Sequence, residues 1–292
     1  MARLRQLEYS MADSTQSYDQ LAAHYDQIFE SWEASILRQA SVLGGILRRE
    51  CADTRPIRVL DCACGIGTQS LGLAMKGFEV EGCDISSGAV QRARLEASKR
   101  GLSVPFSVAN MLQLTALGRS SFDAVICIDN ALPHLESDEQ LLQAAQQAHA
   151  KLRAGGSFIG SIRDYDRFIV ERPTAHGPSF YSDRDRRRMV FQIWDWLDER
   201  CYRFHLSSRK IHNRSGRRSI SPPYIAPCFA VNWETFCNGQ DSSRFVGCRR
   251  LTAVFTSQSS LRTVAVETGK PTPPPENDPR PATQVCSRTI VS

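Results

Sequence analysis

The segment VLDCACGIGTQSLGLA, residues 59–74, constrains the fold more than any other part of the chain. An apolar run ends at Asp61, and Gly65 and Gly67 follow it closely. Glycines carry no side chain, so a ligand can approach the backbone N–H groups at the start of the next helix. A lone GxG pair also occurs in tight turns. Here an apolar strand precedes it, a helix follows, and Asp84 ends the next apolar run, so the segment predicts a nucleotide-binding loop.

Strand and helix patterns alternate along the first 206 residues. Apolar runs typical of buried parallel strands occur at 57–63, 78–84, 105–110, 122–129 and 157–166, and helical stretches with serine caps or glycine stops occur at 69–77, 86–101 and 137–156. Residues 17–49 also show helical spacing of apolar side chains. This alternation predicts an α/β fold with a doubly wound, mostly parallel, Rossmann-like sheet and an N-terminal helical cap. Ligands of such sheets bind at the carboxyl ends of the strands.

The pattern predicts three parts: a helical cap at 1–50, the sheet domain at 51–206 and an irregular tail at 207–292. The tail contains PTPPPENDPRPATQ, which is polar, rich in proline and unable to bury a core. A sheet of this kind needs more strands after the fifth. We therefore expect the C-terminal strands to be missing from the chain or disordered.

Two hypotheses explain the stretch VNWETFCNGQDSSRFVGC, residues 231–248, which has neither helical nor strand periodicity. The underlying gene can be translated in another reading frame, in which the third base of each codon is joined to the next two bases. Codons compatible with residues 231–247 then allow ELGNLLQRAGFEQVRW, which has the pattern of an amphipathic helix followed by a glycine and a strand. One hypothesis is therefore a frame-shifted segment, with the slip near residues 206–214, and the other is an unrelated disordered tail. The native codons decide between them, and no chemistry is assigned to the tryptophan and cysteines of this stretch.

The distribution of charge argues against a nucleic-acid partner. The net charge of +5 comes from residues 207–292, which hold twelve Lys and Arg against five Asp and Glu. The first 206 residues hold 24 against 26. A nucleic-acid partner would therefore depend on the tail alone, and DRDRRR at 183–188 is interpreted as a solvated face or loop.

Composition also suggests the compartment. No apolar run approaches the roughly 20 residues of a membrane helix, and the start, at Met1 or Met11, has no secretory pattern. Neither a CxxC pair nor a zinc-like spacing occurs among the ten cysteines. We therefore expect a cytoplasmic protein with reduced thiols, no membrane partner and no metal site.

The 59–74 segment resembles the first motif, D-x-x-C/A-G-x-G-T, of the class I S-adenosylmethionine-dependent methyltransferases. A dinucleotide-binding loop would carry a third glycine where this chain has Ser70. The resemblance implies S-adenosylmethionine as the cofactor, with its methionine portion at the glycine loop and its ribose at Asp84. The adenine would lie beside Asn110, where the family often has an acid. The implied cofactor-binding residues are Asp61, Cys64, Gly65, Gly67, Thr68, Asp84, Ile85, Asn110, Met111 and Asp129.

Two further motifs resemble the glycine and sarcosine N-methyltransferase branch of that family. The first is D-N-x-x-x-H-L at 129–135, and the second is SIRDYDRFI at 161–169, where the branch carries R-N-Y-D. Arg163 matches the arginine that binds the substrate carboxylate in the branch, and an Asp at 164 replaces the Asn. The branch also has tyrosines on an N-terminal helix over the cofactor. The implied catalytic residues are Tyr25, Asn130 and His134, and the implied substrate-binding residues are Arg163 and Tyr18.

Each of these residues also has a plain structural interpretation. His134 fits a packing or helix-start residue, Arg163 a surface ion pair with one of the acids that follow it, and the tyrosines core positions. The resemblance implies transfer of a methyl group to a small amine, such as glycine or sarcosine, by direct displacement that depends on positioning and desolvation. The alternatives are a methyltransferase acting on RNA or another macromolecule, and an incomplete, inactive cofactor-binding domain. The acceptor, the number of methyl groups and the oligomeric state stay open.

Overall fold

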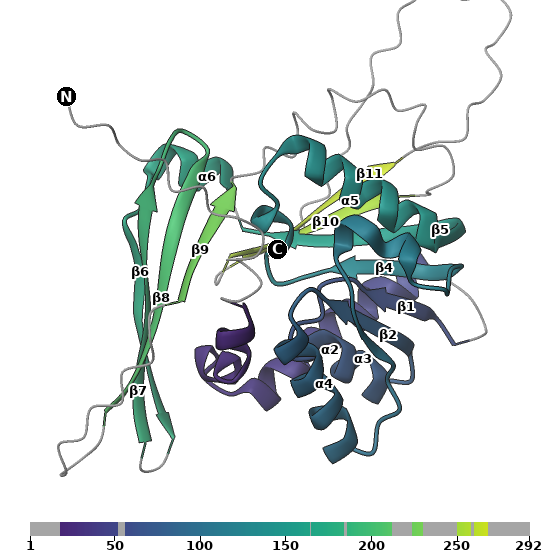
Figure 1. Cartoon of the computed structure of the whole chain (residues 1–292), viewed down its shortest axis with the longest axis horizontal. Coiled ribbons are helices and arrows are strands. Elements are labelled where there is room, and N and C mark those ends of the chain that lie inside the picture. The colour runs from purple at the N-terminus through teal and green to yellow at the C-terminus, as the bar shows by residue number, and fades with distance from the viewer. Residues whose placement is uncertain are drawn as a thin grey trace, which may run out of the picture.

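The computed structural model describes residues 18–51, 56–163, 165–183, 186–211, 224–229, 250–257 and 260–267. Within these ranges, seven strands form the larger sheet, in the order β11-β10-β5-β4-β1-β2-β3 (Figure 1). The strands are β1 Arg58–Asp61, β2 Glu79–Asp84, β3 Phe106–Val108, β4 Phe122–Cys127, β5 Leu152–Ile162, β10 Arg250–Ser257 and β11 Ser260–Glu267. Neighbouring strands run parallel except β10 and β11. The prediction of a mostly parallel sheet is confirmed.

Helices cover both faces of this sheet, as a doubly wound fold requires. They are η1 Tyr25–Ile28, α2 Trp32–Glu50, α3 Thr68–Met75, α4 Ser87–Lys99, η2 Met111–Ala116, η3 Leu132–His134, α5 Asp138–Lys151 and α6 Tyr165–Glu171. One core cluster joins Leu73 of α3 to Ile126 of β4. Another joins Leu141 of α5 to Val125 of the same strand. Successive residues of a strand point to opposite faces, so both faces of β4 are buried, which explains the apolar run at 124–128.

The predicted serine caps are present. Ser31, Ser86 and Ser137 each accept a hydrogen bond from the backbone N–H three residues further on, at 3.2, 3.0 and 3.3 Å. The cap at Ser31 corrects one expectation, because the helix expected over 17–49 is divided. Residues 18–22 are helical, η1 follows, and α2 begins only after Ser31. We call residues 18–30 the N-terminal strap.

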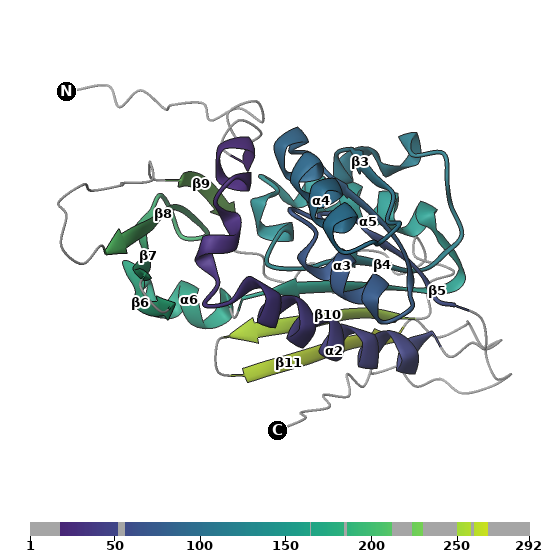
Figure 2. The ribbon, with the colours of Figure 1, turned by 90° about the horizontal axis from the view of Figure 1, so that it is seen from below.

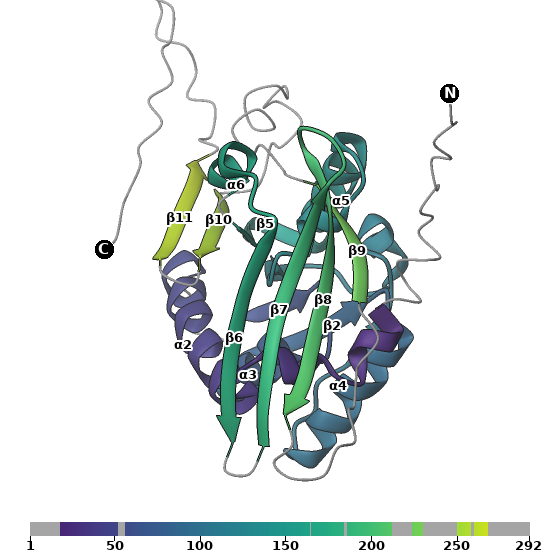
Figure 3. The ribbon, with the colours of Figure 1, turned by 90° about the vertical axis from the view of Figure 1, so that its left-hand side faces the viewer.

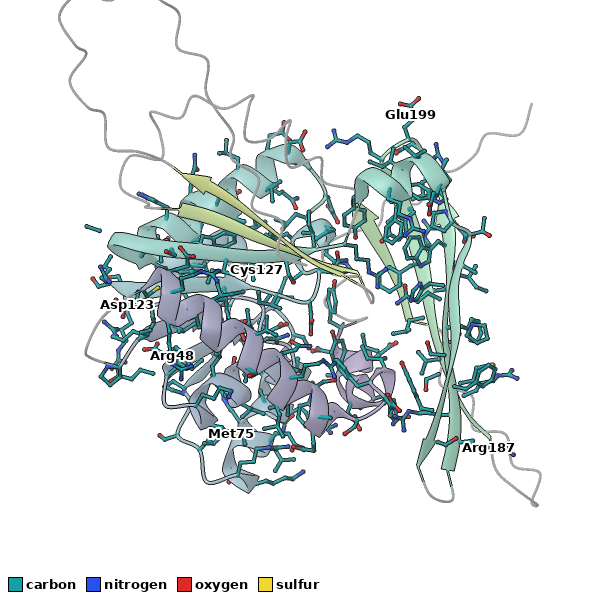
Figure 4. The ribbon with its side chains drawn as sticks, turned by 180° about the vertical axis from the view of Figure 1, so that it is seen from behind. Arg48, Met75, Asp123, Cys127, Arg187 and Glu199 are labelled. Carbon is teal, nitrogen blue, oxygen red and sulfur yellow. The ribbon has the colours of Figure 1, made fainter. Side chains whose placement is uncertain are left out.

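A second, antiparallel sheet stands at the carboxyl ends of the central strands. It has the order β6-β7-β8-β9, formed by Ala175–Asp183, Arg186–Trp196, Cys201–Ile211 and Tyr224–Phe229 (Figure 3). Figure 4 shows Asp123 near the start of β4, and Cys127 at the end of that strand nearer the antiparallel sheet. The antiparallel sheet therefore faces the edge where ligands of parallel sheets bind.

The sequence indicated only one strand-like stretch in this sheet, within 191–206, because half-buried strands lack long apolar runs. On β7, Val190 and Trp194 are buried, whereas Ile193 is 45% exposed. Of the 183–188 stretch, Asp183 ends β6 and residues 186–188 begin β7. The side chain of Arg188 is half-buried, so the interpretation as a solvated face or loop does not hold for that residue.

The expectation of missing C-terminal strands is also corrected. β10 lies parallel to β5, with Arg250 opposite Ser157, and β11 pairs antiparallel with β10. RLTAVFTS and SLRTVAVE contain the β-branched residues that strands favour, a pattern that was overlooked within the irregular tail. Residues 231–248 lie outside the described residues, so the frame hypothesis and the three-part division stay predictions. Among the helices in the described ranges, none has the length and apolarity to span a membrane.

Candidate functional site

A cavity of about 230 Å³ lies at the carboxyl ends of the central strands, between the central sheet, the strap and the antiparallel sheet. Figure 2 shows the strap, in dark purple, running between these two sheets. Of the fifteen residues predicted for the site, thirteen line this cavity: Tyr18, Tyr25, Cys64, Gly65, Thr68, Asp84, Ile85, Asn110, Met111, Asp129, Asn130, His134 and Arg163. The structure therefore brings together residues from six separate stretches of the chain.

The glycine loop presents its backbone to the cavity. Gly65 has φ +52°, in the left-handed region that favours glycine, and a Cβ built there would meet no protein atom within 4 Å. Its N–H donates to Oδ2 of Asp84 at 2.8 Å. Gly67 does not line the cavity; it has φ +93° and precedes α3, where a Cβ would lie 3.1 Å from Leu71. Gly65 thus gives access to a ligand, and Gly67 allows the turn into the helix.

Asp84 is held by two backbone donors. In addition to Gly65, the N–H of Ser86 donates to Oδ1 at 2.9 Å. Enclosure of the carboxyl raises the pKa of Asp84, although backbone N–H groups, that of Ile85 included, act in the opposite direction. A carboxylate has about four acceptor sites, so these backbone bonds leave acceptor capacity for a ligand hydroxyl. The ribose-binding role of Asp84 stays a prediction.

Asn110 caps a helix and also faces the cavity. Its Oδ1 accepts from the N–H of Leu112 at 2.9 Å and so caps η2. The residue also lines the cavity beside Met111. Because an amide oxygen has two lone pairs, Oδ1 can accept a second hydrogen bond from an exocyclic amino group. Asn110 can thus serve where the family often has an acid.

Asp61 does not line the cavity, which corrects its predicted place around the cofactor. Its carboxyl is fully buried and accepts a hydrogen bond from the Ser70 hydroxyl at 2.6 Å. Burial raises the pKa of Asp61 to about 7, although the hydrogen bond from Ser70 acts to lower it. Its contact is therefore with α3, the helix that follows the glycine loop, and its role in this structure is to hold that helix against β1.

Asp129 is positioned by an amide pair that the sequence did not reveal. The Nε2 group of Gln69 donates to Oδ2 of Asp129 at 2.8 Å and to Oε1 of Gln39 at 2.6 Å. Asp129 and Asn130 both have positive φ, 57° and 66°. Positive φ in successive non-glycine residues is uncommon and concentrates at functional sites. The chain turns sharply after β4 and directs both side chains to the cavity.

Asn130 connects several parts of the cavity wall. Its Oδ1 accepts from the backbone N–H of Arg163 at 3.1 Å and from the Tyr165 hydroxyl at 3.0 Å. The Tyr165 hydroxyl also lies 3.2 Å from that of Tyr202, on β8. Asn130 thus links the loop after β4 to the loop after β5 and to the antiparallel sheet. The family resemblance implied a role for Asn130, but no role was predicted for Tyr165 or Tyr202.

Arg163 faces the cavity from the end of β5. Its Nη1 donates to Oε1 of Gln192 at 3.2 Å, and its guanidinium carbon lies 5.3 Å from the centroid of the Trp194 ring. Both partners belong to β7. The side chains of the two acids after Arg163 lie outside the described residues, so the alternative of an ion pair with them stays open. A guanidinium on a cavity wall suits a ligand carboxylate.

Aromatic side chains close the remaining wall. The His134 ring meets Tyr18 of the strap edge-on at 5.6 Å and Phe204 of β8 at 5.8 Å, measured between ring centroids. Burial raises the pKa of Tyr25, and the negative charges of Asp129 and Asp84 raise it further. Tyr25 therefore keeps its proton at neutral pH and presents a hydrogen-bond donor. The packing interpretation of His134 and its predicted place at the site are compatible.

The strap is fastened to the start of α4, close in sequence to Asp84. The Asp19 carboxylate accepts from the Ser86 hydroxyl and from the N–H of Gly88, at 2.5 and 2.9 Å. Arg92 of α4 lies 3.4 Å from the carboxylate of Asp26. Asp19 has no counterpart in the predicted site, and its only signal in the sequence is its position six residues before Tyr25, on the same strap. Within the described ranges, no group of three or more His, Cys, Asp or Glu side chains has the arrangement of a metal site.

Comparison with known proteins assigns the central region. Residues 59–156 match a family model described as a methyltransferase domain. A glycine/sarcosine N-methyltransferase of Parasynechococcus marenigrum is 34% identical over 111 residues, which cover 38% of this chain and 39% of that protein. A ubiquinone biosynthesis O-methyltransferase of Azoarcus is 36% identical over 90 residues, which cover 31% of this chain and 38% of that protein. The chain thus spans about two fifths of the length of each of these relatives.

A solved structure with S-adenosylmethionine bound, of an amino pentose methyltransferase from Micromonospora echinaspora, shares the fold. It has a TM-score of 0.61 and 20% identity, with 80% of this chain and 89% of that chain covered. The likeness in fold thus extends well beyond residues 59–156, which the family model matches. Residues 59–156 therefore form a methyltransferase domain, within the fold that class I S-adenosylmethionine-dependent methyltransferases share.

Proposed function

We propose that the chain binds S-adenosylmethionine and transfers its methyl group to a small amine that carries a carboxylate, such as glycine or sarcosine. One observation carries the proposal: Asp84 and Gly65 on one side, and Arg163 on the other, line the same cavity. A cofactor held at the glycine loop and an anion held at Arg163 would therefore meet in one enclosed space.

The residues present fit the cofactor. The Gly65 backbone is open toward the cavity, where a side chain would meet no protein atom within 4 Å. Asp84 retains acceptor sites for ribose hydroxyls, and Asn110 retains one for an amino group. The cofactor carries its reactive methyl on a positively charged sulfur, and Asp129 supplies a carboxylate on the same wall. These residues are thus complementary to the ribose hydroxyls, the amino group and the charged sulfur of S-adenosylmethionine.

The protein's contribution is to position the acceptor and to exclude water. Asn130 fixes the backbone of Arg163 and the Tyr165 hydroxyl. The strap covers the cavity with Tyr18 and Tyr25, so the reacting groups are removed from bulk water. Holding two reactants in contact can lower a barrier by about 7–11 kcal/mol. Methyl transfer to a neutral amine needs little acid–base catalysis in addition, so positioning and desolvation dominate.

Arg163 supports a carboxylated acceptor. Its planar fork of donors matches a carboxylate in a bidentate manner, and its neighbours on the cavity wall, Phe204 and Leu206, are apolar. The similarity to a glycine/sarcosine N-methyltransferase agrees with this acceptor. Similarity to an O-methyltransferase and to an amino pentose methyltransferase shows that the fold alone does not choose it. The acceptor class therefore rests on Arg163.

A macromolecular acceptor fits less well. The antiparallel sheet and the strap both stand over the carboxyl ends of the strands, and residues from both line the cavity. RNA would have to enter past Phe204 and Tyr18. The first 206 residues are also slightly acidic, with 24 Lys and Arg against 26 Asp and Glu. These features favour a small acceptor over a polyanion.

Titration calorimetry with S-adenosylmethionine tests the cofactor assignment directly. A folded sample is expected to bind one equivalent, and absence of binding would refute the proposal in favour of an inactive domain. Turnover is then measured with sarcosine, glycine and amines that lack a carboxylate. Arg163→Ala is expected to raise the KM of carboxylated acceptors by about 100-fold, the scale of a lost charge pair. Arg167→Ala, an exposed arginine on α6 paired with Glu171, is the matched control. Equal kinetics of the two variants would refute the role of Arg163.

A further inference from the structure

We propose that Gln192 of β7 forms, together with Arg163, the binding site for the acceptor carboxylate: it orients the guanidinium and donates a second hydrogen bond from its own amide. The inference rests on the proposed function and adds a residue that neither the sequence motifs nor the comparisons identify. Gln192 lines the cavity, as Arg163 does.

The orientation of the Gln192 amide follows from its neighbours. Its Oε1 accepts from Nη1 of Arg163 at 3.2 Å and from Nε1 of Trp194 at 2.9 Å. Both neighbours are donors only, because a guanidinium and an indole N–H have no acceptor. The oxygen of the amide must therefore face them. The NH₂ group points away from both donors, and it is the part of this cavity-lining side chain that can donate to an anion.

Trp194 gives this arrangement a rigid base. It is 2% exposed, and its ring stacks on Tyr202 with a centroid distance of 4.6 Å and an interplanar angle of 18°. Phe168 of α6 meets the same ring edge-on at 5.0 Å. A side chain packed on both faces keeps one rotamer, so its N–H holds the Gln192 oxygen in place. Gln192 in turn restricts the Arg163 guanidinium, which lies over the Trp194 ring.

The neighbouring strand places apolar side chains beside this pair. In the β7–β8 register, Gln192 lies opposite Leu206, and Trp194 lies opposite Phe204. Leu206 and Phe204 both line the cavity. In apolar surroundings a carboxylate needs a donor for each oxygen, because an unpaired oxygen loses its water without replacement. One guanidinium with a neutral amide beside it meets that need and keeps the site positive.

The neutrality of Gln192 therefore determines which acceptors bind. A glutamate at this position would place a carboxylate about 3 Å from Nη1 of Arg163, occupy the guanidinium and repel an anionic acceptor. The affinity for an acceptor without a carboxylate would not fall. Gln192→Glu is thus expected to change the preference between two acceptors, which a merely structural substitution does not do.

The test compares glycine with 2-aminoethanol, which lacks the carboxylate, as acceptors for wild-type protein and two variants. Gln192→Glu is expected to raise the KM for glycine about 100-fold, and Gln192→Met, which only removes the amide, about tenfold. The KM for 2-aminoethanol is expected to change less than about threefold in both. Calorimetry with S-adenosylmethionine verifies that each variant is folded, since the cofactor residues are untouched. Gln91→Glu, on the exposed side of α4, controls for the added charge.

Three outcomes would overturn the inference. An unchanged KM for glycine in both variants would show that Gln192 does not contact the acceptor. An equal rise for both acceptors would make Gln192 a structural residue. Wild-type protein that binds S-adenosylmethionine and methylates neither amine would refute the proposed function together with this role. That result differs from the case in which the wild type is active and the KM values of the two variants do not change, which refutes the role of Gln192 alone. If Gln192→Glu does not bind the cofactor, the KM values of Gln192→Met for glycine and for 2-aminoethanol decide between these outcomes.

Discussion

Arg188 on β7 donates a hydrogen bond to the carbonyl oxygen of Glu30 at 2.8 Å, although 158 positions separate the two residues. The same guanidinium donates to the carbonyl oxygens of Gln27, at 3.0 Å, and Phe29, and lies 5.3 Å from the Tyr181 ring centroid. One arginine therefore fastens the antiparallel sheet to the end of the strap. Asp19 fastens the other end to α4, so the strap is held on both sides of the cavity.

Arg188→Ala is expected to loosen the strap and weaken cofactor binding. The substitution removes three hydrogen bonds from a charged donor, each typically worth about 1.5–3 kcal/mol when buried and less when half-exposed. We expect the Kd for S-adenosylmethionine to rise about tenfold and the strap to become sensitive to protease. Calorimetry and limited proteolysis measure these changes. Arg187→Ala is the control, because Figure 4 shows that residue near the far end of the antiparallel sheet. Unchanged affinity in Arg188→Ala would mean that the strap does not depend on this contact.

Gly65→Ala is expected to impair cofactor binding more than folding. A Cβ at Gly65 would project into the cavity, because it would meet no protein atom within 4 Å, and φ is +52°. Gly101 offers a matched control, with φ +65° and an equally open surrounding, but it follows α4 and does not line the cavity. Each alanine is expected to cost about 1 kcal/mol of stability. Only Gly65→Ala should raise the Kd for S-adenosylmethionine, by about tenfold or more, in calorimetry. A similar Kd in the two variants would place the cofactor elsewhere.

The sequence was sufficient to predict the central sheet, because each of its strands leaves a recognisable pattern within a short stretch of the chain. Residues 57–63 and 122–129 are mostly apolar, since both faces of a parallel strand are covered, and serines mark several helix starts. The same patterns predict the cofactor-binding part of the site. Gly65 follows β1 and Asp84 ends β2, and these strands are parallel neighbours, so the proximity of the two residues was predictable from the sequence.

The acceptor side depends on contacts between distant parts of the chain. Gln192 acquires its place only when β7 passes Arg163, and a glutamine on a half-buried strand gives no signal of its own. Asp61 shows the opposite case. The family motif indicates its importance, yet its actual contact is with Ser70. A motif can mark a residue that builds the loop as well as one that touches the ligand.

The edge strands give a prediction about the C-terminal part. A chain that ends at residue 249 lacks β10 and β11 and leaves the edge of β5 without a partner. An unpaired edge of a buried strand favours association, so this chain is expected to aggregate in size-exclusion chromatography. A chain that ends at residue 267 keeps both strands and is expected to stay monodisperse. If both truncated chains behave alike, the pairing of β10 with β5 contributes nothing to solubility.

Asp61 gives the chain a stability that depends on pH. Its ordinary pKa is 3.8, and burial raises the pKa in the folded protein to about 7. Between these values the folded chain binds a proton that the unfolded chain has released, so this residue makes the protein more stable as pH falls from 7 toward 4. Above pH 7 the carboxyl is charged in both states, and the full cost of burying the charge is present.

Asp61→Asn removes this titration and can still accept the hydrogen bond from Ser70. The free energy of unfolding, measured in urea at pH 5.5 and 6.5, is expected to fall in wild type relative to the variant by about 1.4 kcal/mol over that interval. Ser70→Ala tests the cause, since loss of its hydrogen bond to the carboxylate should raise the pKa of Asp61 and shift the pH-dependent interval upward. Parallel stability curves for wild type and Asp61→Asn would show that Asp61 is not protonated on folding. In that case its charge must be balanced by groups other than Ser70.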